Sequence, residues 1–215
     1  MGVSFFVCLM RQEHEKMSRS TILHFVRHGE VDNPQGIYYG RLAGFHLSQK
    51  GKEQAYSAAV FLQSREVTKV YSSPLERTTE TAKILTGHLG IGCEKLDWLN
   101  EVHSPFDGKP ISLLAKRHWD VYTGSGPKFE QPGDVLSRAQ RFIQHCRARH
   151  HGEDVVAVTH GDLIAFVTLW VRGIPITQQE KEPIYKNSLT HASISSLMFE
   201  TEMESEIPQF AYWQP

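Results

Sequence analysis

The sequence contains two His-Gly pairs, His28-Gly29 and His160-Gly161, each directly after an apolar run. A neutral imidazole is a nucleophile near pH 7, because its ordinary pKa of about 6.5 leaves it mostly deprotonated. One such histidine would carry little weight, since the chain has 12 histidines and a histidine at a strand end is usually structural. The recurrence of the pair after two apolar runs indicates a site that uses both imidazoles.

Two arginines are expected beside these imidazoles. Arg27 adjoins His28, and Arg77 falls in the first turn of a helix predicted to follow a short strand at residues 69–72. Guanidinium groups bind phosphate oxygens through paired hydrogen bonds, and backbone N–H groups at a helix start, such as that of Gly161, add donors. The formal net charge is only -1, so an anion must be bound by such a local cluster. The cluster predicts a phosphate site.

The strands that position these residues are read from β-branched and apolar runs. We expect strands at residues 21–26, 69–72, 154–159 and 192–199. Ligands of open α/β sheets bind beyond the carboxyl ends of the strands, where both His-Gly pairs fall. The two imidazoles should therefore project from one edge of the sheet if their strands are neighbours.

Four helices alternate with these strands. Ser48 is the predicted cap of a helix whose apolar face is Ala55, Ala58, Ala59 and Leu62. A second helix should begin with Ser73-Pro74 and be lined by Leu75, Thr79, Ala82 and Leu89; further helices are predicted at residues 135–146 and 163–171. The alternation predicts an α/β fold, a three-layer sandwich whose mainly parallel central sheet is flanked by helices.

Two irregular segments interrupt the pattern. Residues 30–47 form a predicted loop, and loops of this length tend to be functional. Residues 97–132 are aromatic and rich in glycine and proline, with one helix near 111–122, and are expected to form a loop-rich lid. Basic side chains in the second segment either meet a second anionic group of the substrate or are merely solvated: Lys109, Lys116, Arg117, His118 and Lys128.

Four separated motifs resemble those of the histidine phosphatase superfamily, the phosphoglycerate-mutase-like proteins. The resemblance covers roughly residues 21–200 in the family's order. The motifs are Arg27-His28-Gly29-Glu30, followed by Gly40-Arg41; Leu47-Ser48-Gln49-Lys50-Gly51 with Gln54-Ala55; Ser72-Ser73-Pro74-Leu75-Glu76-Arg77-Thr78-Thr79-Glu80-Thr81-Ala82; and Val158-Thr159-His160-Gly161.

The resemblance implies a phosphohistidine mechanism, with His28 as the nucleophile and no metal or other cofactor. Arg27, Arg77 and His160 would bind the transferring phosphoryl group, His160 in protonated form once phosphate is bound. Asn33 resembles the family's additional phosphate-contacting asparagine, although it stands one residue closer to His28 than in many relatives.

The proton donor is implied by a Leu-x-Glu segment. Leu99-Asn100-Glu101 fits this pattern and makes Glu101 the candidate acid, whereas the family's usual continuation is replaced by Ser104-Pro105-Phe106-Asp107-Gly108. Asp107 is the second candidate. The alternative for either carboxyl is an ordinary surface residue.

The expected activity is hydrolysis of a small phosphorylated metabolite. A mutase, which returns the phosphoryl group to a substrate hydroxyl, is the competing enzyme. A non-catalytic phosphate-binding or regulatory member of the same fold is the third alternative, and the intact set of arginines and histidines argues against it.

Composition bounds the setting of this activity. Lys+Arg 23 against Asp+Glu 24 gives no basic field for nucleic acid or anionic membranes, and three separated cysteines fit neither a disulfide framework nor a thiolate metal site. We expect a cytoplasmic protein, with a homodimer left open. The apolar run at residues 3–10 is short against the ~20 residues of a membrane span. Residues 1–20 are interpreted as a flexible leader and 21–215 as one domain.

Overall fold

Three parallel strands form the centre of the sheet in the computed structural model, which describes residues 20–201, 203 and 205–215. Strand β4 (Asp154–Thr159) lies between β1 (Thr21–Arg27) and β2 (Val67–Ser72) and is parallel to both. Arg27 is opposite Thr159, and Ser72 is opposite Val158. The residues that follow the three strands therefore meet at one edge of the sheet, as predicted.

The outer strands make the sheet mixed. The six strands are ordered β3-β2-β4-β1-β5-β6. Strand β3 (Cys93–Lys95) is parallel to β2. Strand β5 (Ile194–Phe199) is antiparallel to β1, and β6 (Gln209–Trp213) is antiparallel to β5. The sequence did not predict β3 or β6. Both lie at edges of the sheet and none of their residues is fully buried, and β3 has only three residues.

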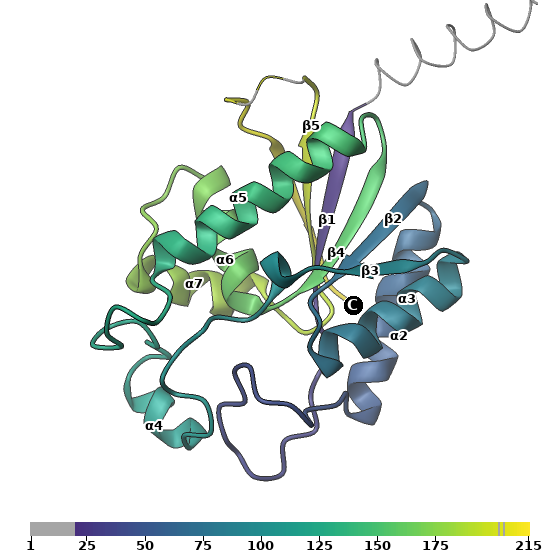
Figure 1. Cartoon of the computed structure of the whole chain (residues 1–215). Coiled ribbons are helices and arrows are strands. Elements are labelled where there is room, and N and C mark those ends of the chain that lie inside the picture. Colours follow the sequence, from purple (N-terminus) through teal and green to yellow (C-terminus); the bar gives the residue numbers. More distant parts are fainter. Residues whose placement is uncertain (1–19, 202, 204) are drawn as a thin grey trace, which may run out of the picture.

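Helices cover the two faces of the sheet (Figure 1). On one face lie α2 (Gln49–Gln63) and α3 (Glu76–Leu89). On the other lie α5 (Pro132–Arg149) and α6 (Gly161–Val171), with α7 (Gln178–Ser188) beside α6. The predicted α/β sandwich, with a sheet between two helical layers, is confirmed, and α7 is an addition to it.

Alternation along β4 builds both cores. Val155 and Ala157 belong to the core under α5 and α6, whereas Val156 and Val158 belong to the core under α2 and α3. All of β4 is buried because both faces of the strand are covered by helices. This burial on both faces explains why the strand is a continuous apolar run in the sequence.

Ser48 caps α2 as predicted, and its Oγ accepts a hydrogen bond from the N–H of Gly51 at 3.0 Å. The prediction for α3 was wrong in detail, because the helix begins at Glu76 and Pro74 lies before its first turn. Because the buried face of α3 includes an arginine and two threonines, the apolar pattern did not locate this face correctly. The buried residues of α3 are Arg77, Thr78, Thr81, Ala82 and Leu85.

The segment at residues 97–132 consists of turns, a short 3-10 helix at Asp97–Leu99 and α4 (Ile111–Lys116). The predicted helix at 111–122 is thus shorter, because His118 and Trp119 adopt left-handed φ angles of 52° and 59°. The segment pairs with the loop at 30–47, since Tyr38 N–H donates to the Lys109 carbonyl at 2.7 Å. Movement of this segment as a lid stays a prediction.

Within the described part of the chain, no helix has both the length and the apolar character needed to cross a membrane. The predicted leader, apart from Ser20, lies outside the described residues.

Candidate active site

His28 follows β1 and is almost completely buried. Its Nδ1 lies 2.8 Å from the carbonyl oxygen of Gly29. A carbonyl can only accept, so Nδ1 carries the proton and Nε2 keeps its lone pair. Burial, together with the charges of Arg77 and Arg27, holds the pKa of His28 well below 6.5. The structure therefore presents a neutral imidazole in the tautomer that a nucleophile requires.

His160 follows β4 and lies beside His28, with ring centroids 5.4 Å apart. Arg77 Nη2 donates to His160 Nδ1 at 3.1 Å, and Nε2 lies 2.9 Å from the hydroxyl of Ser73. Nδ1 is therefore an acceptor and Nε2 carries the proton. Burial and the charge of Arg77 hold the pKa of His160 well below 6.5. His160 is neutral here, and its protonation on phosphate binding stays a prediction.

Arg77 is fully buried behind the two imidazoles. Besides His160, its Nη2 donates to the carbonyl of Gly40 at 2.7 Å, and its guanidinium lies 4.7 Å from the ring centroid of Tyr39. Its Nε and Nη1 have no hydrogen-bond partner among the described residues. Two buried donors of this guanidinium, on different edges of the group, are thus left without a partner in the described part of the chain.

Arg27 approaches from the end of β1. Its Nη1 donates to the carbonyl of Leu189, and its guanidinium lies 5.5 Å from the ring centroid of Tyr185. Its Nε is buried, and the described chain offers it no partner. Both predicted phosphate-binding arginines therefore lie near His28 with donors to spare.

Glu101 is buried, and its Oε2 lies 3.7 Å from His160 Nδ1. Its Oε1 accepts from the N–H of Val102 at 2.9 Å, and Arg41 Nε donates to its carbonyl oxygen at 2.7 Å. Burial and the negative charge of Asp162 raise the pKa of the Glu101 carboxyl. A carboxyl with a raised pKa is suited to general acid catalysis.

Two other predicted site residues, Asp107 and Asn33, use their side chains in hydrogen bonds to nearby backbone. Asp107 accepts from the N–H of Arg41 at 3.0 Å and is not among the residues that line the cavity described below, whereas Glu101 is. Asn33 uses its side-chain amide within its own loop, donating to the carbonyl of Ile37 at 2.8 Å and accepting from its N–H at 3.3 Å. The role of Glu101 or Asp107 as the acid and the phosphate-binding role of Asn33 stay predictions.

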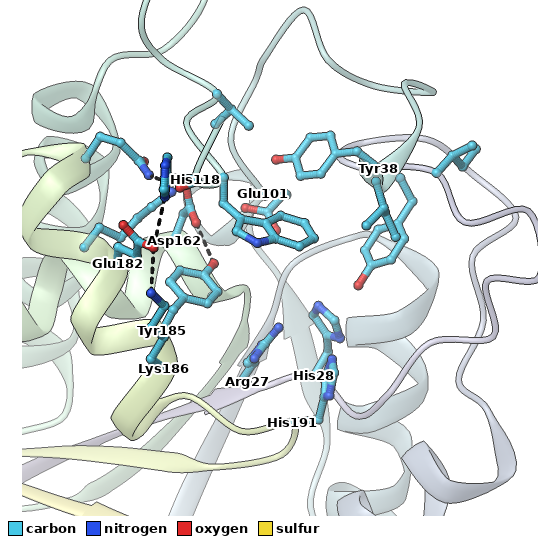
Figure 2. A pocket seen from close by; sticks show the side chains of 18 residues that line it. Arg27, His28, Tyr38, Glu101, His118, Asp162, Glu182, Tyr185, Lys186 and His191 are labelled. Atoms are coloured by element: carbon cyan, nitrogen blue, oxygen red, sulfur yellow. Dashed lines mark hydrogen bonds and ion pairs between the residues drawn. The ribbon is translucent and has the colours of Figure 1, made fainter. Parts of the chain in front are cut away.

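A cavity of about 420 Å³ opens onto His28 (Figure 2). His28 and His191 lie on one side of it, with Glu182 and His118 across it. Gly161, the first residue of α6, also lines it. The lining residues are Arg27, His28, Ile37, Tyr38, Tyr39, Glu101, Ile111, His118, Trp119, Val121, Gly161, Asp162, Gln178, Lys181, Glu182, Tyr185, Lys186 and His191.

Gly161 permits a close approach from α7. A Cβ at this position would lie 2.1 Å from the hydroxyl oxygen of Tyr185. Tyr185 in turn donates to Asp162 Oδ1 at 2.5 Å. Glycine is therefore required here to seat the helix that forms one wall of the cavity.

Asp162 is the centre of a buried network that the sequence did not reveal. Lys181 Nζ lies 2.7 Å from Asp162 Oδ2, which also accepts from the hydroxyl of Tyr122. Burial alone would raise the pKa of Asp162, but the charge of Lys181 and the hydrogen bonds from Lys181, Tyr122 and Tyr185 outweigh it and lower the pKa. The network joins α6, α7 and the segment at 97–132 around the cavity.

His191 was also missed. Its ring centroid lies 5.8 Å from that of His28, and burial together with the charge of Arg27 lowers its pKa to about 3. Of the basic residues predicted to meet a second anionic group, only His118 lines the cavity, where Lys181 and Lys186 from α7 are found instead. The sequence analysis did not identify α7 or its cavity-lining residues, because this helix is polar and contains Pro183.

The described residues contain no cluster of three or more His, Cys, Asp or Glu side chains able to hold a metal ion.

The fold and this site match one family. The model of the histidine phosphatase superfamily (branch 1) matches residues 23–204, and the chain belongs to this superfamily. The resemblance seen in the sequence is thereby confirmed.

Individual relatives agree with this assignment. The chain is 30% identical over 206 residues to the protein Rv0525 of Mycobacterium tuberculosis, covering 93% of this chain and 98% of that one. It is 31% identical over 148 residues to phosphoserine phosphatase 1 of Hydrogenobacter thermophilus, covering 64% and 70%. The native structure of mycobacterial glucosyl-3-phosphoglycerate phosphatase Rv2419c superimposes with a TM-score of 0.74 at 24% identity, covering 91% and 99%, which is a likeness of fold. The predicted class, a phosphoric monoester hydrolase, is consistent with the names of these proteins.

Proposed function

We propose that this protein hydrolyses a small phosphomonoester through a covalent phosphohistidine on Nε2 of His28. The observation that carries the proposal is the hydrogen bond from Nδ1 to the Gly29 carbonyl, which leaves Nε2 as the unprotonated nitrogen. Burial and two guanidinium charges keep the pKa of this imidazole low, so the nucleophilic form dominates at neutral pH.

In the first step Nε2 attacks phosphorus, the N–P bond forms and the P–O bond to the leaving group breaks. Glu101 gives its proton to the departing oxygen. In the second step water attacks the phosphohistidine, Glu101 takes a proton from that water, and inorganic phosphate leaves with His28 restored. The raised pKa of Glu101 supports the protonated starting state.

The arginines supply the electrostatic part of this mechanism. Within the residues that the structure describes, three buried guanidinium donors have no partner: Arg27 Nε, Arg77 Nε and Arg77 Nη1. Donors fixed before the reaction stabilise the charge of the transferring phosphoryl group without reorganising during the step. His160 holds Arg77 through Nδ1, and we assign phosphoryl binding to His160 and to the N–H of Gly161 on the predicted pattern.

The substrate is proposed to be a metabolite in the cytoplasm, without nucleic-acid or membrane partners and with a homodimer left open. The nearly neutral charge of the chain supports the absence of nucleic-acid and anionic-membrane partners. Turnover should survive exhaustive chelation, because the proposed steps use only side chains of the protein.

Rapid quenching with an aryl phosphate labelled on phosphorus tests the mechanism. The wild type should carry acid-labile, alkali-stable label, and His28→Ala should lose both label and turnover while circular dichroism stays unchanged. His88→Ala, on the outer side of α3, is the matched control and should behave as the wild type. Label on serine or cysteine would reject the mechanism, and transfer to an added alcohol in preference to water would indicate a mutase. Binding of phosphate with neither label nor turnover would indicate a non-catalytic member.

A further inference from the structure

The cavity beyond the phosphate-binding residues is walled by rings and aliphatic side chains. Tyr38, Ile111, Trp119, Val121 and Tyr185 line it. Trp119 is 46% exposed although it belongs to this wall. A partly exposed indole in the wall of a cavity offers a stacking surface for a ring.

The backbone of Trp119 is held in an uncommon conformation. Both His118 and Trp119 have left-handed φ angles, 52° and 59°, which cost free energy in residues other than glycine. Trp119 N–H donates to the Leu114 carbonyl at 2.8 Å, and Gln178 Nε2 donates to the His118 carbonyl at 2.9 Å. The turn is thus fixed from α7, and the indole is carried by a constrained backbone.

Gln178 also presents an unused acceptor. Its side-chain nitrogen is identified by its bond to a carbonyl, since only the nitrogen of the amide can donate there. The other atom, Oε1, is buried and has no partner among the described residues, and Gln178 as a whole is only 8% exposed and lines the cavity. A buried acceptor without a partner is unfavourable, so this oxygen suits an O–H or N–H donor of a ligand.

The charges in this part of the cavity are already neutralised. Lys181 Nζ lies 2.7 Å from Asp162, and Lys186 Nζ lies 2.8 Å from Glu182. Both lysines that line the cavity are therefore paired, and Arg27 lies at the phosphate end. A second carboxylate or phosphate on the substrate would meet no unpaired lysine there and would approach the carboxylates of Asp162 and Glu182.

From these contacts we propose that the substrate is a phosphomonoester of an uncharged ring that carries at least one O–H or N–H donor. The ring would stack on Trp119 and the donor would bind Gln178 Oε1. The proposal rests on the proposed phosphatase function for its phosphate end. It excludes small carboxylate-bearing esters, whose second charge the cavity does not neutralise, as the preferred substrates.

The test compares kcat/KM of the purified full chain for four esters. Glucose 6-phosphate and adenosine 5′-monophosphate carry uncharged rings and distinguish a sugar ring from an aromatic ring, whereas 3-phosphoglycerate and phosphoserine carry a carboxylate. We expect at least one ring ester to exceed both carboxylate esters by about tenfold or more. Trp119→Ala should raise KM for that ring ester by about 5- to 10-fold, with a smaller effect of Trp119→Phe. The KM values of the carboxylate esters should change less than twofold.

Tyr56→Ala is the matched control, because it removes an exposed aromatic ring from α2 and should leave all four esters unaffected. The acceptor role of Gln178 is tested with phenyl phosphate and its analogues that bear one ring hydroxyl. At least one hydroxylated analogue should show the lower KM in the wild type, and this advantage should disappear in Gln178→Met. The proposal is overturned if a carboxylate ester is preferred, if Trp119→Ala affects all esters equally, or if no hydroxyl position gives an advantage.

Binding measurements separate this proposal from the proposed activity. Equilibrium dialysis of His28→Asn with the same esters gives dissociation constants without turnover. If the wild type hydrolyses none of the esters but the variant binds a ring ester about tenfold more tightly than both carboxylate esters, the activity fails and the ring site stands. Hydrolysis with the opposite order of binding would leave the phosphatase function intact and reject the ring site.

Discussion

Arg77 Nη2 donates a hydrogen bond of 3.1 Å to Nδ1 of His160. The same nitrogen also donates to the Gly40 carbonyl, so both hydrogen bonds that hold the guanidinium in place come from Nη2. Nε and Nη1 have no partner in the described part of the chain and are proposed to bind an anion. His160 in turn has Nε2 engaged with Ser73. Both ring nitrogens of His160 are thus engaged, so the phosphoryl binding proposed for His160 requires one of these two hydrogen bonds to be exchanged for one to phosphate.

Glu101→Gln tests the proton donor through the leaving group. With an aryl phosphate, whose leaving oxygen barely needs a proton, phosphorylation of His28 should change little. With an alkyl phosphate it should slow by about 10²–10⁴-fold, the usual range for general acid catalysis. Single-turnover quenching measures both rates. Equal losses for the two substrates would reject Glu101 and move attention to Asp107.

The dependence of kcat/KM on pH follows from two pKa shifts of the free protein. The raised pKa of Glu101 keeps the acid form present above its ordinary value of 4.5, so the rate with an alkyl phosphate should fall as pH rises through this raised pKa. The lowered pKa of His28 keeps the nucleophile neutral well below pH 6.5, so the loss of activity caused by protonation of His28 should occur well below that pH. A stopped assay across the pH range, with Glu101→Gln lacking the alkaline loss, checks both signs. An acidic loss centred near 6.5 would contradict the buried, neutral His28.

Lys181→Met should destabilise the fold strongly because it leaves the buried carboxylate of Asp162 without its cation. Breaking a buried pair in this way costs about 3–5 kcal/mol in the free energy of unfolding. The matched control is Lys186→Met, whose partner Glu182 lies one turn away on α7, and because Lys186 is largely exposed the loss of stability should be much smaller. Urea denaturation at pH 7 measures both changes.

The same variant has a pH signature. The folded-state pKa of Asp162 is lowered, so the contribution of its charge is present above the unfolded value of 3.8 and is lost as pH falls through the folded value. Protonated Asp162 needs no cation. The difference in unfolding free energy between wild type and Lys181→Met should therefore narrow toward low pH, and a difference independent of pH would argue against a charged pair.

Gly29→Ala should destabilise the fold at the contact between the residues after β1 and the first turn of α2. The added Cβ would lie 2.3 Å from the carbonyl oxygen of Gly51 in the first turn of α2. Overpacking of this kind costs about 1–3 kcal/mol or more. Gly87→Ala is the control, because a Cβ in that exposed turn of α3 meets nothing within 4 Å and should stabilise by about 0.5–1 kcal/mol. Thermal melts of the two variants should move in opposite directions.

The sequence predicted the parts of the site that follow buried strands. Strands β1 and β4 are rich in apolar and β-branched residues and are followed at once by His28 and His160, whereas Arg77 lies in the first turn of the helix after β2, so the sequence placed all three residues at one edge of the sheet. Parallel pairing of these neighbours then brings them together.

The parts missed from the sequence depend on tertiary contacts between weakly patterned segments. Lys181 and Tyr185 lie on a polar helix interrupted by Pro183, and their significance comes only from Asp162 on another helix. His191 precedes β5 as one histidine among 12. The buried face of α3 was misassigned because inward-facing arginine and threonine side chains do not follow an apolar stripe.

The order of the strands has a consequence for how the chain acquires its active site. The central strand β4 is the last of the three parallel strands along the chain, and Ile22 on β1 pairs with Asp154 more than 100 residues later. Since β4 lies between β1 and β2 in the sheet, the strand pairing that joins the end of β1 to the end of β2 can form only after residues 154–159 have emerged from the ribosome. Such long-range pairing slows folding, and we expect nascent chains ending before β4 to need protection from aggregation.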